Sequence, residues 1–192
     1  MKFISKLVFI LTTAALSVSC TSEPAAPVTV ENLETVSATV SAVDVKKRLV
    51  SLKSPDGGST TIEVPEEVRN LAQVKVGDQL TVRYYKSIGA ALRPKGTPTD
   101  LNAVDEQSVL GRAQPGAKPG GGVGSVTATT VAIQSVDKTN HTVTFSGPDG
   151  YVRVVQVKDP AAQKFIATLK KDDLVDLTFT EALAVSVEAA KK

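Results

Sequence analysis

Hydrophobic and polar residues alternate one by one along most of the chain after residue 35, and a period of two is typical of β-strands. Short alternating runs rich in Val and Thr are separated by turn signals. The pattern predicts strands in two stretches, over 36–44, 49–53, 60–64, 79–86 and 88–92, and over 129–137, 142–146, 152–157, 174–180 and 182–187. Segments 65–74 and 159–169 carry proline and apolar residues at helical spacing, so each predicts a short helical piece.

The same succession of elements occurs twice. A PDG turn follows the second strand in each stretch, and the offset between the stretches is 93 residues up to the third strand and 95 afterwards. Apolar positions keep one alternation parity in both, as in Val50/Val143, Leu52/Phe145, Ile62/Val155, Val64/Val157, Leu80/Val175, Val82/Leu177 and Tyr84/Phe179. Because a one-residue slip would turn every strand inside out, the shared parity indicates an internal duplication with one inward face. The PDG motif is then interpreted as a hairpin turn that sets the register, with the glycine at positive φ.

The order strand, strand, hairpin, strand, short helix, closing strands resembles the OB-fold. The sequence therefore predicts an all-β chain with short helices, built as two tandem small OB-like five-stranded barrels over residues 36–92 and 126–188. An SH3-like barrel or an open meander is the alternative. Residues 93–125 are predicted as a Pro/Gly-rich linker with a short helix over LNAVDEQSVLGRA, and 189–192 as a tail.

The first 19 residues have the layout of a secretory signal, with a lysine-bearing start, an apolar run and small residues at the end. Cys20, the only cysteine, follows directly and resembles the lipobox cysteine of bacterial lipoproteins, although Leu16 stands one residue earlier than usual. That resemblance implies acylation of Cys20 by diacylglycerol and, with Thr21 next to it, an outer-membrane protein facing the periplasm. Residues 20–35 would be the lipidated tether. Ordinary secretion with a chance cysteine is the alternative.

Charge argues against nucleic acid as a partner. Without Lys2 and Lys6 the chain from residue 20 holds 20 basic residues, from 22 minus 2, against 20 acidic ones, so it is formally neutral. A neutral surface gives little attraction to a phosphate backbone. Only Tyr85 and Tyr151 are predicted as exposed rings for base stacking. With one cysteine there is no internal disulfide, and stability has to come from the core.

Three features of the sequence are candidates for a catalytic or binding site. The GGGVGS run at 120–125 lacks the third glycine of a dinucleotide loop and precedes a strand, so it is interpreted as linker. His141, the single histidine, lies in a polar turn and is interpreted as solvated; its equivalent in the first repeat is Arg48. The pair Asp172–Asp173 occupies a turn, where aspartates usually bond the backbone. No catalytic residue, metal ligand or cofactor is predicted, and the ligand-binding residues are left unknown.

The sequence shows two further resemblances to known families. One covers a single repeat, and the other covers the layout of the whole chain. The runs TVAIQSVDKTNHTVTF, VVQVKDP and LKKDDLVDLTF resemble the small periplasmic copper chaperone of copper/silver efflux systems, which implies an OB-like barrel. That family binds Cu(I) with Met and His under a Trp, and the chain from residue 20 has neither Met nor Trp. The layout also resembles bacterial envelope lipoproteins with tandem ATV…VD…PDG…VGD…VxYY repeats, a group without an established activity.

The prediction that follows is a non-enzymatic envelope lipoprotein that acts as a binding or scaffolding module. Its expected partners are the membrane, through the lipid at Cys20, and an envelope protein or other envelope component, with no nucleic acid. A periplasmic metal-handling protein related to copper chaperones is the alternative.

Overall fold

The computed structural model describes residues 25–190, and within them the chain is almost entirely β-structure. The elements are β1 (Val28–Asp44), β2 (Leu49–Lys53), β3 (Ser59–Glu63), the 3₁₀ turn η1 (Leu71–Gln73), β4 (Gln79–Leu92), β5 (Val104–Arg112), β6 (Gly120–Asp137), β7 (Thr142–Ser146), β8 (Val152–Gln156), α1 (Pro160–Ile166) and β9 (Leu174–Glu188). The all-β class with short helices is confirmed. No helix in this range has the length and apolar character needed to cross a bilayer.

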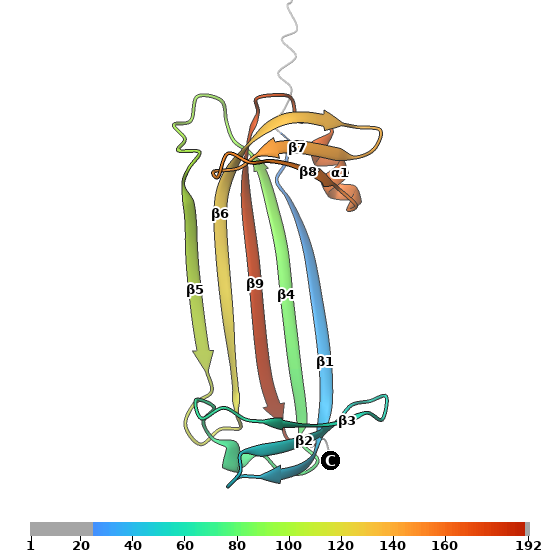
Figure 1. The fold of residues 1–192 in the computed structure, drawn as a ribbon, viewed down its shortest axis with the longest axis vertical. Coiled ribbons are helices and arrows are strands. Elements are labelled where there is room, and N and C mark those ends of the chain that lie inside the picture. Colours follow the sequence, from blue (N-terminus) through green and yellow to red (C-terminus); the bar gives the residue numbers. More distant parts are fainter. Residues whose placement is uncertain (1–24, 191–192) are drawn as a thin grey trace, which may run out of the picture.

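All strands belong to one open sheet with the order β3-β2-β1-β4-β9-β6-β7-β8, and β5 pairs with the remaining edge of β6. Five long strands, β5, β6, β9, β4 and β1, lie side by side in Figure 1. The prediction of two tandem OB-like five-stranded barrels is not confirmed, because the described residues form a single open sheet. The physical reason is that β4 joins the two repeats: it pairs with β1 on one side, from Gln79 to Ala90, and with β9 on the other, from Gln79 to Leu92. The open arrangement weighed as an alternative is the closer description.

Each end of the sheet carries a small cap. The first cap consists of β2, β3 and η1, and the second cap of β7, β8 and α1; they lie at opposite ends in Figure 1. Each begins at a β-bulge, between Val40 and Ala42 in β1 and between Ile133 and Ser135 in β6. A bulge bends its strand and increases its twist, so the end of the strand leaves the long sheet and pairs with the hairpin instead.

The two repeats have the same register, which supports the internal duplication. We call residues 28–92 the first copy and 120–188 the second copy. Val36 lies opposite Val82, and the equivalent Thr129 lies opposite Leu177. The two bulges also coincide at the offset of 93 residues.

Turn geometry repeats in the same way. Arg48 and His141, at equivalent positions, have φ of 55° and 52°, and their carbonyls accept hydrogen bonds from Val64 at 2.7 Å and Val157 at 2.8 Å. The two PDG turns behave as predicted, because Gly57 and Gly150 have φ of 91° and 75°. Equivalent local sequences therefore adopt equivalent turns, whereas the sheet that joins them is a long-range feature.

Both caps fold onto the same face of the long sheet, which we call the cap face. Cross-strand partners share a face. The first cap contacts Leu80 and its partner Val187, and the second cap contacts Ala90 and its partner Leu177, all of one alternation parity. Midway between the caps a polar row crosses this face, made of Asn32, Lys86, Glu181, Ser125 and Ser108. Lys86 and Glu181 are equivalent in the two copies, lie opposite each other and form an ion pair at 3.5 Å.

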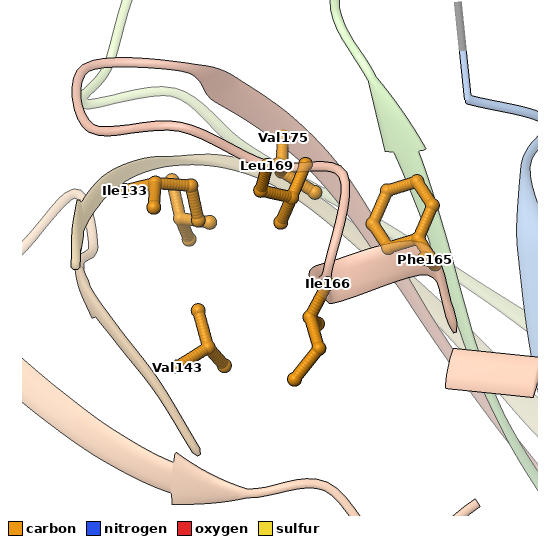
Figure 2. Close-up of a cluster of buried hydrophobic side chains, with 7 residues drawn as sticks. Ile133, Val143, Phe165, Ile166, Leu169 and Val175 are labelled. Carbon is orange, nitrogen blue, oxygen red and sulfur yellow. The ribbon is translucent and has the colours of Figure 1, made fainter. Parts of the chain in front are cut away.

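The core is divided between the caps. The second cap holds the larger cluster, which joins Phe165, Ile166 and Leu169, from α1 and the residues after it, with Ile133, Val143 and Val175 (Figure 2). The first cluster consists of Val40, Val50, Leu52, Val64, Leu71 and Val74. The centre of the sheet is uncovered in the described residues, so Ile88 and Leu183 are 49% and 40% exposed.

Three predicted boundaries change. The segment expected to be a short helix forms the edge strand β5, which pairs with β6 in a continuous register from Val104 to Arg112. The glycine run expected to be linker is the start of β6. Residues 28–35, expected in the tether, belong to β1 because they pair with β4. The signal segment and residues 20–24 lie outside the described residues.

Candidate functional site

A cavity of about 540 Å³ lies in the first copy, between the first cap and the cap face of the sheet. Its walls come from β2, β3 and the segment 64–74 on the cap side, from β4 and β9 on the sheet side, and from the end of β5 and the start of β6. Cavities of this size hold small molecules in other proteins. It is the strongest candidate for a functional site among the described residues.

The lining of the cavity is aliphatic. Apart from glycine backbone and five polar or charged residues, every lining residue is Val, Leu, Ile, Pro or Ala, and none is aromatic. The five are Glu63, Glu67, Arg69, Asn70 and Arg112. The four charged ones are exposed, and none of them forms an ion pair within residues 25–190. The lining contains no hydroxyl, thiol or imidazole group, so it offers a shape and an apolar surface, without a nucleophile.

Comparison of the two copies explains why the first is hollow. In the second copy, Phe165 of α1 packs in a cluster that includes Val28 of β1. The residue equivalent to Phe165 is Asn70, which has φ of 63° and precedes the single turn η1. The residue equivalent to Val28 is Gly121. The core under the first cap therefore lacks both apolar side chains that meet under the second cap, and the space is left open.

Glycine at the start of β6 is required by close backbone contacts. A Cβ atom on Gly121 would lie 2.9 Å from the carbonyl oxygen of Gly111 in β5, and one on Gly122 would lie 3.0 Å from that of Leu183 in β9. A side chain at either position would push a neighbouring strand away. The glycine run thus permits close approach of β5, β6 and β9 at the cavity wall.

Polar contacts hold residues 113–119, the loop between β5 and β6, against the first cap. The Asn70 side-chain amide donates to the Gln114 carbonyl at 2.9 Å, and its oxygen accepts from the Gly116 N–H at 3.4 Å. The Lys118 ammonium donates to the Gln73 carbonyl at 3.2 Å and forms an ion pair with Asp78. These contacts fix the loop that brings β6 back to the cavity wall.

Asp78 is the one charged residue buried in the described chain, at 3% exposure. Its carboxylate also accepts the Lys75 N–H at 2.8 Å. Burial opposes ionisation, but the Lys118 ammonium and the Lys75 amide outweigh it and hold the pKa of Asp78 below its ordinary value. The equivalent Asp173 accepts the Lys170 N–H at 2.8 Å and has no cationic partner within residues 25–190.

Of the residues considered for chemistry, His141, Asp172 and Asp173 do not line this cavity, whereas residues 120–123 of the glycine run do. Asp172 is a turn residue with φ of 69°, and Asp173 bonds the backbone. Tyr151 is 72% exposed beside the second PDG turn. No group of three His, Cys, Asp or Glu residues within 25–190 is placed to hold a metal ion. Cys20 lies outside the described residues.

Sequence reasoning missed the cavity. A signal was present in the alignment of the two copies, where Asn70 is equivalent to Phe165 and Gly121 is equivalent to Val28. Alternation parity shows which residues face inward in each copy. It does not show that Asn70 and Gly121 belong to the same core, and the cavity is seen only when the two are placed together.

Comparisons with known proteins do not assign the chain to a family. No family model matches the chain, no curated protein matches it, and no solved structure matches its fold.

Proposed function

We propose that the protein is a non-enzymatic binding module of the bacterial envelope, anchored by a lipid on Cys20, and that the cavity of the first copy is its ligand site. The observation that carries this proposal is the difference between the copies. The core under the second cap is filled by side chains of both copies, Phe165 and Val28 among them, whereas about 540 Å³ of aliphatic space stays open under the first cap. An apolar pocket of this kind is the default binding site of a small domain.

The envelope part of the proposal rests on the signal-like N-terminus and the lipobox-like Cys20. The anchored protein would face the periplasm from the outer membrane and present the cavity to an envelope component. Each cap with its half of the sheet would be an OB-like unit left open on one side, since the order of elements is the one expected for that fold.

Leu110 gives a direct test of the cavity. This residue of β5 lines it and is 64% exposed, so a substitution there should be compatible with folding. In the full chain carrying Cys20→Ala, Leu110→Asp should lower the affinity for the neutral fluorescent probe N-phenyl-1-naphthylamine about tenfold or more, because an apolar probe would have to desolvate the new carboxylate. Fluorescence titration measures the affinity.

The matched control is Val109→Asp. Val109 is the preceding residue of β5, is 72% exposed and points to the opposite face of the sheet. It should leave probe binding unchanged. Equal losses in the two variants, or no binding by the parent chain, would refute the cavity as the ligand site.

A further inference from the structure

The chemistry of the cavity wall restricts what it can hold. The lining has no aromatic side chain for stacking, so an aromatic ligand such as the probe is held there by apolar contact alone. Polar ligands need hydrogen-bonding groups in the interior, but the one lining amide, Asn70, already bonds Gln114 and Gly116. The remaining polar lining residues are the exposed Glu63, Glu67, Arg69 and Arg112. The interior therefore suits an unbranched aliphatic group, and the polar part of the ligand belongs outside.

We infer that the cavity of the first copy binds the alkyl chain of an amphiphile and leaves its polar head among these exposed charged residues. This inference rests on the proposed function and names its ligand class. The four charges comprise two of each sign, so anionic heads find Arg69 and Arg112 while the ammonium of a zwitterionic head finds Glu63 and Glu67. All these ligands share the alkyl chain, whose burial supplies the binding energy.

A lipid on Cys20 that anchors the protein lies in the membrane, so the alkyl chain in the cavity belongs to a second molecule.

The test is a homologous series of alkyl maltosides, fatty acids and lysophosphatidylcholines, each below its micelle concentration, titrated into the full chain carrying Cys20→Ala by isothermal titration calorimetry. Each added methylene should raise the affinity about fourfold while it is buried, and the gain should stop when the cavity is full. The head group with the highest affinity at equal chain length identifies the source, as an uncharged glycolipid, a free fatty acid or a phospholipid.

A pair of valines in β6 supplies the matched variants. Val123 lines the cavity and is 50% exposed, while Val126 is 37% exposed and points to the other face. Val123→Phe should make the affinity level off at a shorter chain, and Val126→Phe should leave the series unchanged. Binding of N-phenyl-1-naphthylamine without any chain-length dependence overturns the alkyl-chain inference and leaves the proposed binding function standing. Failure of both ligand types overturns the two together.

Discussion

Asp78→Asn is expected to lower the free energy of unfolding by about 2 kcal/mol at neutral pH. The substitution removes the charge that pairs with Lys118 and leaves that ammonium, only 25% exposed, without its partner. Breaking a deeply buried pair costs about 3–5 kcal/mol, but the Lys118 side chain is partly exposed, so we expect a smaller loss. Urea denaturation followed by circular dichroism measures it.

The control is Asp173→Asn in the second copy. Both aspartates accept a backbone N–H in the same turn at 2.8 Å, but only Asp78 has a lysine partner. Asp173→Asn should therefore cost about 1 kcal/mol or less. Equal losses at the two positions would show that the turn, and not the ion pair, supplies the stability.

The same pair makes the stability of the protein sensitive to acid. The pKa of Asp78 is lower in the folded chain than its ordinary value, so its contribution is present above that ordinary value and is lost as the pH falls through the folded pKa. The difference between the parent chain and Asp78→Asn should accordingly shrink below about pH 4. The loop 113–119 loses one of its contacts, the Lys118–Asp78 ion pair, in the same range, so probe binding to the cavity should weaken with it.

Cys20→Ala is expected to move the protein from the membrane fraction to the soluble fraction of the envelope. A single acyl chain gives only marginal membrane binding, whereas two or more chains anchor a protein stably. Removal of the diacylglycerol site should therefore change partitioning almost completely. Mass spectrometry of the two proteins should differ by the mass of the lipid in addition to the side-chain change.

Cys20→Ser is the companion variant, because it keeps the size and polarity of the side chain and lacks the thiol. It should behave like Cys20→Ala. If the parent chain has the mass of an unmodified protein and partitions as the two variants do, it is secreted without a lipid and the cysteine is incidental. The cavity and its ligand class do not depend on that outcome.

Alternation predicted the local elements well. The predicted bounds of β2 and β7 match those of the structure. The second-copy helix begins inside the predicted segment 159–169, where the Asp159 carboxylate accepts the N–H groups of Ala161 and Ala162 at 2.8 and 2.9 Å. Hydrophobic period and helix capping are local properties, which a sequence displays directly.

Sheet closure could not be predicted in the same way. Parity correctly identified Val50 and Val143 as core residues, at 5% and 7% exposure. It also assigned Ile62 and Val155 to the inward face, and they are 40% and 41% exposed because the sheet stays open around them. Parity gives the face of a strand, whereas closure depends on which strands pair over long range, here β4 with β9.

We propose that an alkyl chain occupies the space under the first cap, where the equivalent space under the second cap is filled by Phe165 and Val28. Methyl NMR of the Cys20→Ala chain, labelled at Ile, Leu and Val and titrated with laurate, tests it most directly. The account predicts large shifts for the cavity methyls of Ile62, Leu71 and Leu183, and unchanged signals for Ile133 and Val143 in the second core. Unperturbed cavity methyls, or shifts of equal size in both cores, would contradict it.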